Sequence, residues 1–156
     1  MMVPVQEDQC MQMKRDFRFF HFLTEEDIIQ LREFFICNSY AAGEDLWREG
    51  DSSYFIAFIT RGRVETKKET EFKGKQVVVG VYGSESLIGI VSLLSSEKRP
   101  VTATALEDCS VLMLGQESFD TLNIEHPELS NRLMKGMLFC LSMRLKQSYE
   151  RLAAIF

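Results

Sequence analysis

Between Asn38 and Leu114 the chain is a succession of short β-type segments separated by turn residues. Glycine recurs through this region, and Gly50–Asp51 and Lys73–Gly74–Lys75 have the composition of hairpin turns. Strands are predicted at Tyr54–Thr60, Arg63–Phe72, Lys75–Tyr82, Val101–Leu106 and Ser110–Leu114. Strands at such regular spacing favour a β sandwich or a jelly roll over βαβ units.

Helical patterns lie on both sides of this β region. Thr24, followed by three acidic residues ending at Asp27, predicts a capping box for a helix that continues to about residue 36. Residues 1–16 are expected to form a helical N-terminal extension, and residues 17–125 hold the capped helix, the β region and a short helix at Gln116–Leu122. A long helix is predicted over residues 126–156, with Pro127 in its first turn. The predicted fold is mainly β with flanking helices.

An apolar seam at alternating spacings of four and three follows the long helix, as in a coiled coil. Its members are Met134, Leu138, Leu141, Leu145, Ser148, Leu152 and Ile155. Met137, Phe139 and Cys140 supply a second apolar face, which a helix packed only on its own β core would not need. We therefore expect one face to pack on the β region and the seam to form a homodimer. Ser148, the polar member, is expected to fix the register or to contact a ligand.

Leu87–Ala105 combines features that favour binding of an anion. Gly89 precedes a short apolar helix, and Arg99 follows after a polar loop, just before an alternating strand that begins at Val101. Free amides at a helix start and an arginine can hold one anion together. The alternatives are that Arg99 is a solvated surface charge or belongs to a structural ion pair.

Composition argues against several functional classes. The chain has 18 basic and 23 acidic residues, a net charge of −5, which is unlike a nucleic-acid-binding surface. No segment is long and apolar enough for a membrane span, and no secretory signal opens the chain. The four cysteines are scattered, so we expect free thiols and a cytoplasmic location. With His21 and His126 as the only histidines, we expect neither a metal site nor an enzyme.

The elements in this order resemble the cyclic-nucleotide-binding domain of the catabolite activator and fumarate–nitrate regulator (Crp/Fnr) type. The resemblance covers about Phe17–Phe156 and depends on several motifs. These are Ala42–Gly43–Glu44, Arg48–Glu49–Gly50–Asp51, Tyr54–Phe55–Ile56, Arg61–Gly62–Arg63–Val64, Ala105–Leu112 and His126–Pro127–Glu128–Leu129. The resemblance implies a double-stranded β-helix, or jelly roll, whose C-terminal helix dimerises, and a regulatory module whose ligand is cyclic AMP or cyclic GMP.

The resemblance also implies a ligand site, because the family's phosphate-binding cassette falls on Leu87–Ala105. The implied ligand-binding residues are Gly89, Ile90, Val91, Arg99, Pro100, Val101, Thr102 and, on the last helix, Ser148. Ile90 occupies the place of a glutamate that binds the ribose 2′-hydroxyl, and Glu85 stands where glycine is common. Pro100 removes an N–H donor near the anion. Loss of a buried carboxylate–hydroxyl bond weakens binding by about 1.5–3 kcal/mol, so Arg99 is expected to hold a cyclic nucleotide weakly, or another small anion.

Three functions follow from these features. The first is a ligand-sensing regulator that signals through its C-terminal helix. The second is a ligand-free dimeric interaction protein with a degenerate pocket. The third is the effector half of a Crp/Fnr-type transcription regulator. No helix-turn-helix domain follows Phe156 in this chain and the net charge is negative, so we expect no nucleic-acid binding by this chain alone. Without a long apolar segment, we also expect no membrane partner.

Overall fold

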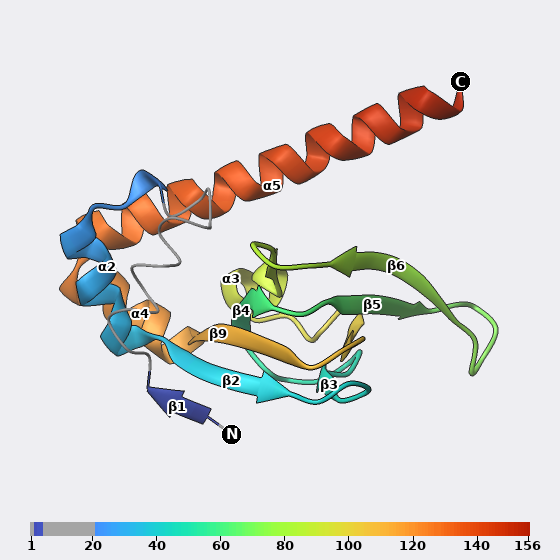
Figure 1. Ribbon diagram of the computed structural model, residues 1–156, viewed down its shortest axis with the longest axis horizontal. Coiled ribbons are helices and arrows are strands. Elements are labelled where there is room, and N and C mark those ends of the chain that lie inside the picture. The colour runs from blue at the N-terminus through green and yellow to red at the C-terminus, as the bar shows by residue number, and fades with distance from the viewer. Residues whose placement is uncertain (1, 5–20) are drawn as a thin grey trace.

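Two antiparallel β sheets and a set of flanking helices make up the computed structural model, which describes residues 2–4 and 21–156 (Figure 1). The first sheet consists, in spatial order, of β1 (Met2–Pro4), β2 (Ile36–Tyr40), β9 (Cys109–Gly115), β4 (Phe55–Arg61) and β7 (Leu87–Ile88). The second consists of β3 (Asp45–Trp47), β8 (Thr102–Ala105), β5 (Val64–Glu69) and β6 (Gln76–Tyr82). The predicted mainly-β jelly roll with flanking helices is confirmed.

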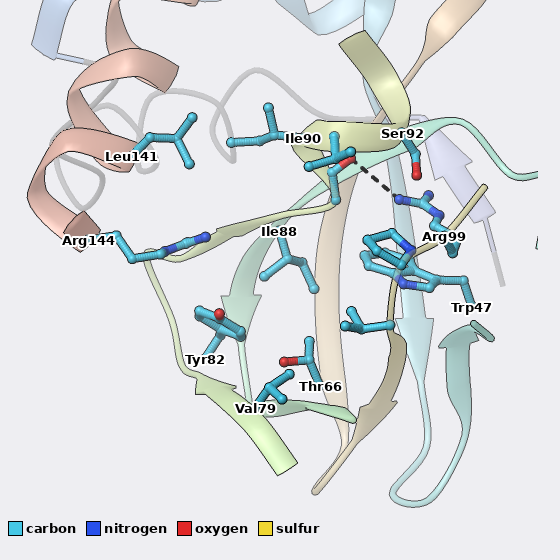
Figure 2. A pocket seen from close by; sticks show the side chains of 14 residues that line it. Trp47, Thr66, Val79, Tyr82, Ile88, Ile90, Ser92, Arg99, Leu141 and Arg144 are labelled. Atoms are coloured by element: carbon cyan, nitrogen blue, oxygen red, sulfur yellow. Dashed lines mark hydrogen bonds between the residues drawn. The ribbon is translucent and has the colours of Figure 1, made fainter. Parts of the chain in front are cut away.

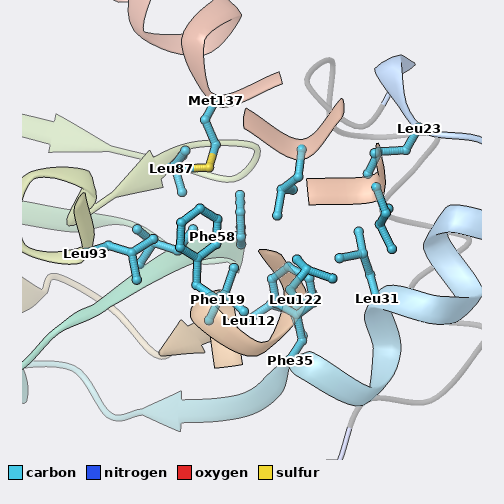
Figure 3. Packing of buried hydrophobic residues seen from close by; sticks show 14 of the residues in the cluster. Leu23, Leu31, Phe35, Phe58, Leu87, Leu93, Leu112, Phe119, Leu122 and Met137 are labelled. Atoms are coloured by element: carbon cyan, nitrogen blue, oxygen red, sulfur yellow. The ribbon is translucent and has the colours of Figure 1, made fainter. Parts of the chain in front are cut away.

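Strand β4 is buried on both faces, which explains its unbroken apolar run. Ile56 and Phe58 belong to the core between the first sheet and the helices (Figure 3). Ala57 and Ile59 belong to a second core between the two sheets. All four side chains are inaccessible to solvent. Because alternate residues of a strand point to opposite faces, β4 joins the two cores.

The first described helix begins with the predicted capping box. In α2 (Glu25–Leu31) the Asp27 amide donates to Thr24 Oγ1 at 3.1 Å, and the Thr24 amide donates to Asp27 Oδ2 at 2.9 Å. The helix continues as the 3₁₀ turn η2 (Arg32–Phe34). The predicted end near residue 36 is therefore slightly late, because Ile36 already pairs with Met113 in the first sheet.

Three helices complete the fold: α3 (Ile90–Ser95), α4 (Gln116–Glu125) and α5 (Pro127–Ile155). The first half of α5 packs on the core through Leu129, Leu133 and Met137, and its second half diverges from the sheets toward the C-terminus (Figure 1). The Arg132 guanidinium donates two hydrogen bonds of 2.6 Å to the Asp27 carboxylate, which fastens α5 to α2. The apolar members of the predicted seam are 37–74% exposed. None of the described helices is both long and apolar enough to cross a bilayer.

Two local predictions need correction. Met2–Pro4 is a strand paired with β2, not part of a helix, and the rest of the predicted helical extension lies outside the described residues. Gly50–Asp51 is not a hairpin turn, because the strands before and after it, β3 and β4, belong to different sheets. By contrast, Lys73–Gly74–Lys75 does join the paired strands β5 and β6, as predicted.

Candidate anion-binding cavity

A cavity of about 230 Å³ lies between β6, α3 and α5. Its described lining residues are Trp47, Thr66, Val79, Tyr82, Ile88, Gly89, Ile90, Val91, Ser92, Arg99, Pro100, Val101, Leu141 and Arg144. Figure 2 shows Ser92, Arg99 and Trp47 at one end, and Leu141 and Arg144 at the other. The cavity thus brings residues of both sheets together with the long helix.

Arg99 is held at the inner end of this cavity. Its side chain is 1% exposed, and the guanidinium stacks on the rings of Trp47, at 3.8 Å, and Phe55, at 4.5 Å. Nε donates to Ser53 Oγ at 3.0 Å, and the terminal nitrogens donate to the carbonyls of Phe55 at 2.8 Å and Gly89 at 3.4 Å. These contacts hold the guanidinium in one position.

Arg99 forms no salt bridge with a described residue, and the Asp51 carboxylate acts on its charge only as a longer-range Coulombic attraction. All three bonded acceptors are neutral, and a guanidinium has N–H groups beyond these three. Burial lowers the pKa of Arg99 to about 10, which leaves the group charged at neutral pH. A buried charge without a partner is unfavourable, so the arrangement favours binding of an anion.

Two further polar atoms in the lining also lack a partner. The Ser92 hydroxyl and the Trp47 indole N–H are buried, and neither makes a hydrogen bond to a described residue. Native structures satisfy nearly all buried donors and acceptors. Both groups are hydrogen-bond donors in the lining of the cavity that also holds Arg99.

Gly89 is required by the way in which Arg99 is held. Its φ is +88°, in the left-handed region that glycine adopts without strain. A Cβ at this position would lie 2.7 Å from the guanidinium Nη1 and 2.8 Å from the Phe55 carbonyl oxygen. Any other residue would therefore move the guanidinium or the strand that supports it.

The outer part of the cavity is apolar and includes a second arginine. Val79 and Val91 are about half exposed at the rim, and Leu141 lies there on α5. Arg144, one turn after Leu141, stacks on the Tyr82 ring at 4.7 Å and donates to the Leu87 carbonyl. The cavity therefore contacts α5 directly.

The structure brings most of the predicted ligand-binding residues to this cavity. Those that line it are Gly89, Ile90, Val91, Arg99, Pro100 and Val101. Thr102 does not, because its hydroxyl accepts the Glu49 amide at 2.9 Å and fastens β8 to the loop after β3. The Ser148 hydroxyl donates to the Arg144 carbonyl at 3.1 Å and is also outside the lining. A contact of Ser148 with a ligand across a dimer stays a prediction.

Glu85, the acidic residue that stands where glycine is common in the family, is not a lining residue of the cavity. It is exposed, and its amide donates to the Ile59 carbonyl at 2.9 Å. Sequence reasoning missed Trp47, Tyr82 and Arg144 as cavity residues. Arg144 carried a weak signal, since it follows Leu141 by three residues and shares its helix face.

The fold and the cavity define a β-sandwich domain that can hold a small ligand against a long helix. Residues 37–126, more than half of the chain, match the family model of the cyclic nucleotide-binding domain. The chain belongs to the cyclic nucleotide-binding domain family.

Similar proteins agree with this assignment and confirm the resemblance to Crp/Fnr-type regulators. The transcriptional activator protein FnrA of Stutzerimonas stutzeri is 34% identical over 61% of this chain and 38% of its own length. Lysophospholipase NTE1 of Phaeosphaeria nodorum is 29% identical over 60% of this chain, but this spans only 6% of that protein. A crystal structure of a cyclic nucleotide-binding domain from Methylobacillus flagellatus has a TM-score of 0.78 at 22% identity, covering 86% of this chain and 75% of that one.

Proposed function

We propose that this domain is a regulatory module that binds a cyclic nucleotide or another small anion at Arg99. The observation that carries the proposal is the buried guanidinium, held in place by neutral acceptors and without a salt bridge to a described residue. The free donors of Ser92 and Trp47 in the same cavity add to it. Membership of the cyclic nucleotide-binding domain family supports a cyclic nucleotide as the first ligand to test.

Ligand occupancy is proposed to reach the rest of the protein through α5. Leu141 and Arg144 belong to α5 and line the cavity, and Arg144 is bonded to the strand that leads into Gly89. A ligand shifts the position of this helix only if it binds one position more tightly than another. The exposed apolar seam of α5 is proposed to form a homodimer, which would carry that shift to a second subunit.

One observation favours a second candidate function, a ligand-free dimeric interaction protein. Ile90 is only 8% exposed and packs with the helix-side core, at the position where the family resemblance implies a carboxylate. With an apolar residue at this position, the cavity would support the fold without binding a ligand. The similarity to FnrA likewise favours a variant of the first proposal, in which the module is the effector half of a transcription regulator.

Isothermal titration of the purified protein with cyclic AMP and cyclic GMP tests the proposal. We expect measurable binding of at least one nucleotide and a loss of at least about tenfold, or about 1.4 kcal/mol, in Arg99→Ala. Arg63→Ala, which removes an exposed arginine outside the cavity, is the matched control and should bind as the parent does. Unchanged affinity in a folded Arg99→Ala variant would contradict the site. If neither nucleotide nor inorganic phosphate gives a heat of binding, the result would favour the ligand-free alternative.

A further inference from the structure

The lining of the cavity has two chemically different parts. Its inner end offers the Arg99 cation and the unpartnered donors of Ser92 and Trp47. Around and outside this end lie aliphatic side chains, labelled in part in Figure 2: Val79, Ile88, Ile90, Val91, Pro100, Val101 and Leu141. A ligand that fills the cavity would therefore place its negative group at Arg99 and the rest of its surface against hydrocarbon.

Outside the inner end, the described lining has three polar side chains that could bind hydroxyl groups on the ligand body, those of Thr66, Tyr82 and Arg144. None of the described lining residues is acidic, and none is asparagine or glutamine. The Thr66 hydroxyl is already directed to the Gly80 carbonyl, at 3.4 Å. A hydroxyl placed against Ile88 or Ile90 would lose its water without gaining a hydrogen bond, which is unfavourable.

The partial exposure of the rim residues Val79 and Val91 also favours a ligand with an apolar body. Val91 is 50% exposed and Val79 is 54% exposed, although both line a cavity. An apolar ligand surface resting on them would remove this hydrocarbon from water. The volume of about 230 Å³ is also below the roughly 300–1,000 Å³ of sites for drug-sized ligands. The cavity therefore suits a compact ligand.

We propose that the cavity selects a compact anion with an apolar, ring-sized body, such as an aryl phosphate or an aryl carboxylate, over an anion with a hydroxylated sugar body. This inference rests on the proposed function, because it assumes that Arg99 binds an anion. It adds the chemical class of the ligand, which the anion site alone leaves open.

Three phosphate probes with different bodies test the inference by isothermal titration. Phenyl phosphate presents an apolar ring, ribose 5-phosphate presents a hydroxylated ring, and inorganic phosphate has no body. We expect phenyl phosphate to bind at least about tenfold more tightly than either of the others, a difference of about 1.4 kcal/mol. Arg99→Ala should weaken all three if they share the anion site.

A pair of variants on α3 tests where the preference arises. Val91→Ser removes an apolar rim residue, and Leu94→Ser makes the same kind of change at a residue of similar exposure that is outside the lining. Neither side chain is buried, so both variants should fold. We expect Val91→Ser to reduce the advantage of phenyl phosphate over inorganic phosphate at least about threefold, and Leu94→Ser to leave it unchanged.

The outcomes separate this inference from the proposed function. If ribose 5-phosphate binds as tightly as phenyl phosphate, or more tightly, the apolar preference is wrong while the anion site stands. Equal effects of Val91→Ser and Leu94→Ser would also overturn the inference, because the preference would not arise at the rim. If no phosphate probe and no cyclic nucleotide binds, both the inference and the proposed function are wrong.

Discussion

At the scale of single residues, the cavity depends on the contacts that hold the Arg99 guanidinium and on the space that Gly89 leaves for it. The guanidinium of Arg99 needs carbonyl acceptors and aromatic faces around it, because these keep a buried charge in one place. Gly89 supplies one carbonyl and leaves the space in which the guanidinium lies. The absence of a side chain at residue 89 is thus as much a part of the site as the arginine.

Gly89→Ala is therefore expected to damage both stability and binding. The strain of a left-handed alanine is about 1–2 kcal/mol, and the clash with Arg99 and Phe55 adds to it. Gly74→Ala is the matched control, because Gly74 has φ +84° but nothing within 4 Å of its added Cβ. Urea unfolding should show a larger loss of stability for Gly89→Ala than for Gly74→Ala. Equal losses, with anion binding intact in both, would show that the close approach at Gly89 has no consequence.

At the scale of secondary-structure elements, the ion pair between Asp27 and Arg132 joins the first described helix to the long one. Burial opposes ionisation of Asp27, but its hydrogen bonds to Arg132 and to the Thr24 amide outweigh this and hold the pKa of Asp27 below its usual value of 3.8. A carboxyl group with a lowered pKa stabilises the fold above that usual value. The stabilisation is lost as the pH falls through the lowered pKa.

Asp27→Asn should lower the free energy of unfolding by about 1–2 kcal/mol at pH 7, since it removes the buried partner of an ion pair whose Arg132 side chain is 35% exposed. The same variant should lose less stability than the parent when the pH is lowered from 7 to 3. Asp120→Asn, at an exposed position of α4, serves as the control. Urea titrations at both pH values measure the effect. A parent and an Asp27→Asn variant with parallel pH dependence would contradict the role of this ion pair.

The elements that sequence predicts well are those whose signal is local. The capping box at Thr24 and the hairpin at Lys73–Gly74–Lys75 require only neighbouring residues, and both are present. Gly50–Asp51 has the same local chemistry as a hairpin, but the next strand pairs in the other sheet, and turn composition does not encode that choice.

Some residues of the candidate site can likewise be predicted from the local sequence, whereas others come from distant parts of the chain. Leu87–Ala105 is one continuous segment, and six of its seven predicted ligand-binding residues line the cavity. Trp47, Tyr82 and Arg144 come from distant strands and a helix, and apart from the weak signal at Arg144 nothing in their own neighbourhoods indicates that they line the same cavity as Arg99. Thr102 shows the reverse case, since it lies in the predicted segment but its hydroxyl is directed to the Glu49 amide.

At the scale of the whole molecule, the second half of α5 exposes the predicted apolar seam. Leu141 lines the cavity as well as belonging to the seam, so a variant there would mix two effects. Leu152 is 57% exposed and outside the cavity lining, which makes it the better position to test. We expect Leu152→Asp to weaken the homodimer, because it would place two charges in an apolar seam.

Analytical ultracentrifugation measures this prediction directly. The parent should sediment as a dimer and Leu152→Asp should shift toward the monomer, with a dissociation constant raised at least about tenfold. Gln147→Asp adds the same charge at an exposed α5 position outside the seam and should remain dimeric. A parent that sediments as a monomer, or a Leu152→Asp variant as dimeric as Gln147→Asp, would contradict the seam as an interface.

The attachment of α5 near one end gives this helix the geometry of a lever. At about 1.5 Å per residue, Leu141 lies about 14 Å along the axis from the Arg132 attachment and Ile155 about 35 Å from it. If the helix tilts as a rigid rod about that attachment, a displacement of about 1 Å at Leu141 becomes about 2.5 Å at Ile155. A small rearrangement beside the cavity would thus be magnified at the far end of the helix.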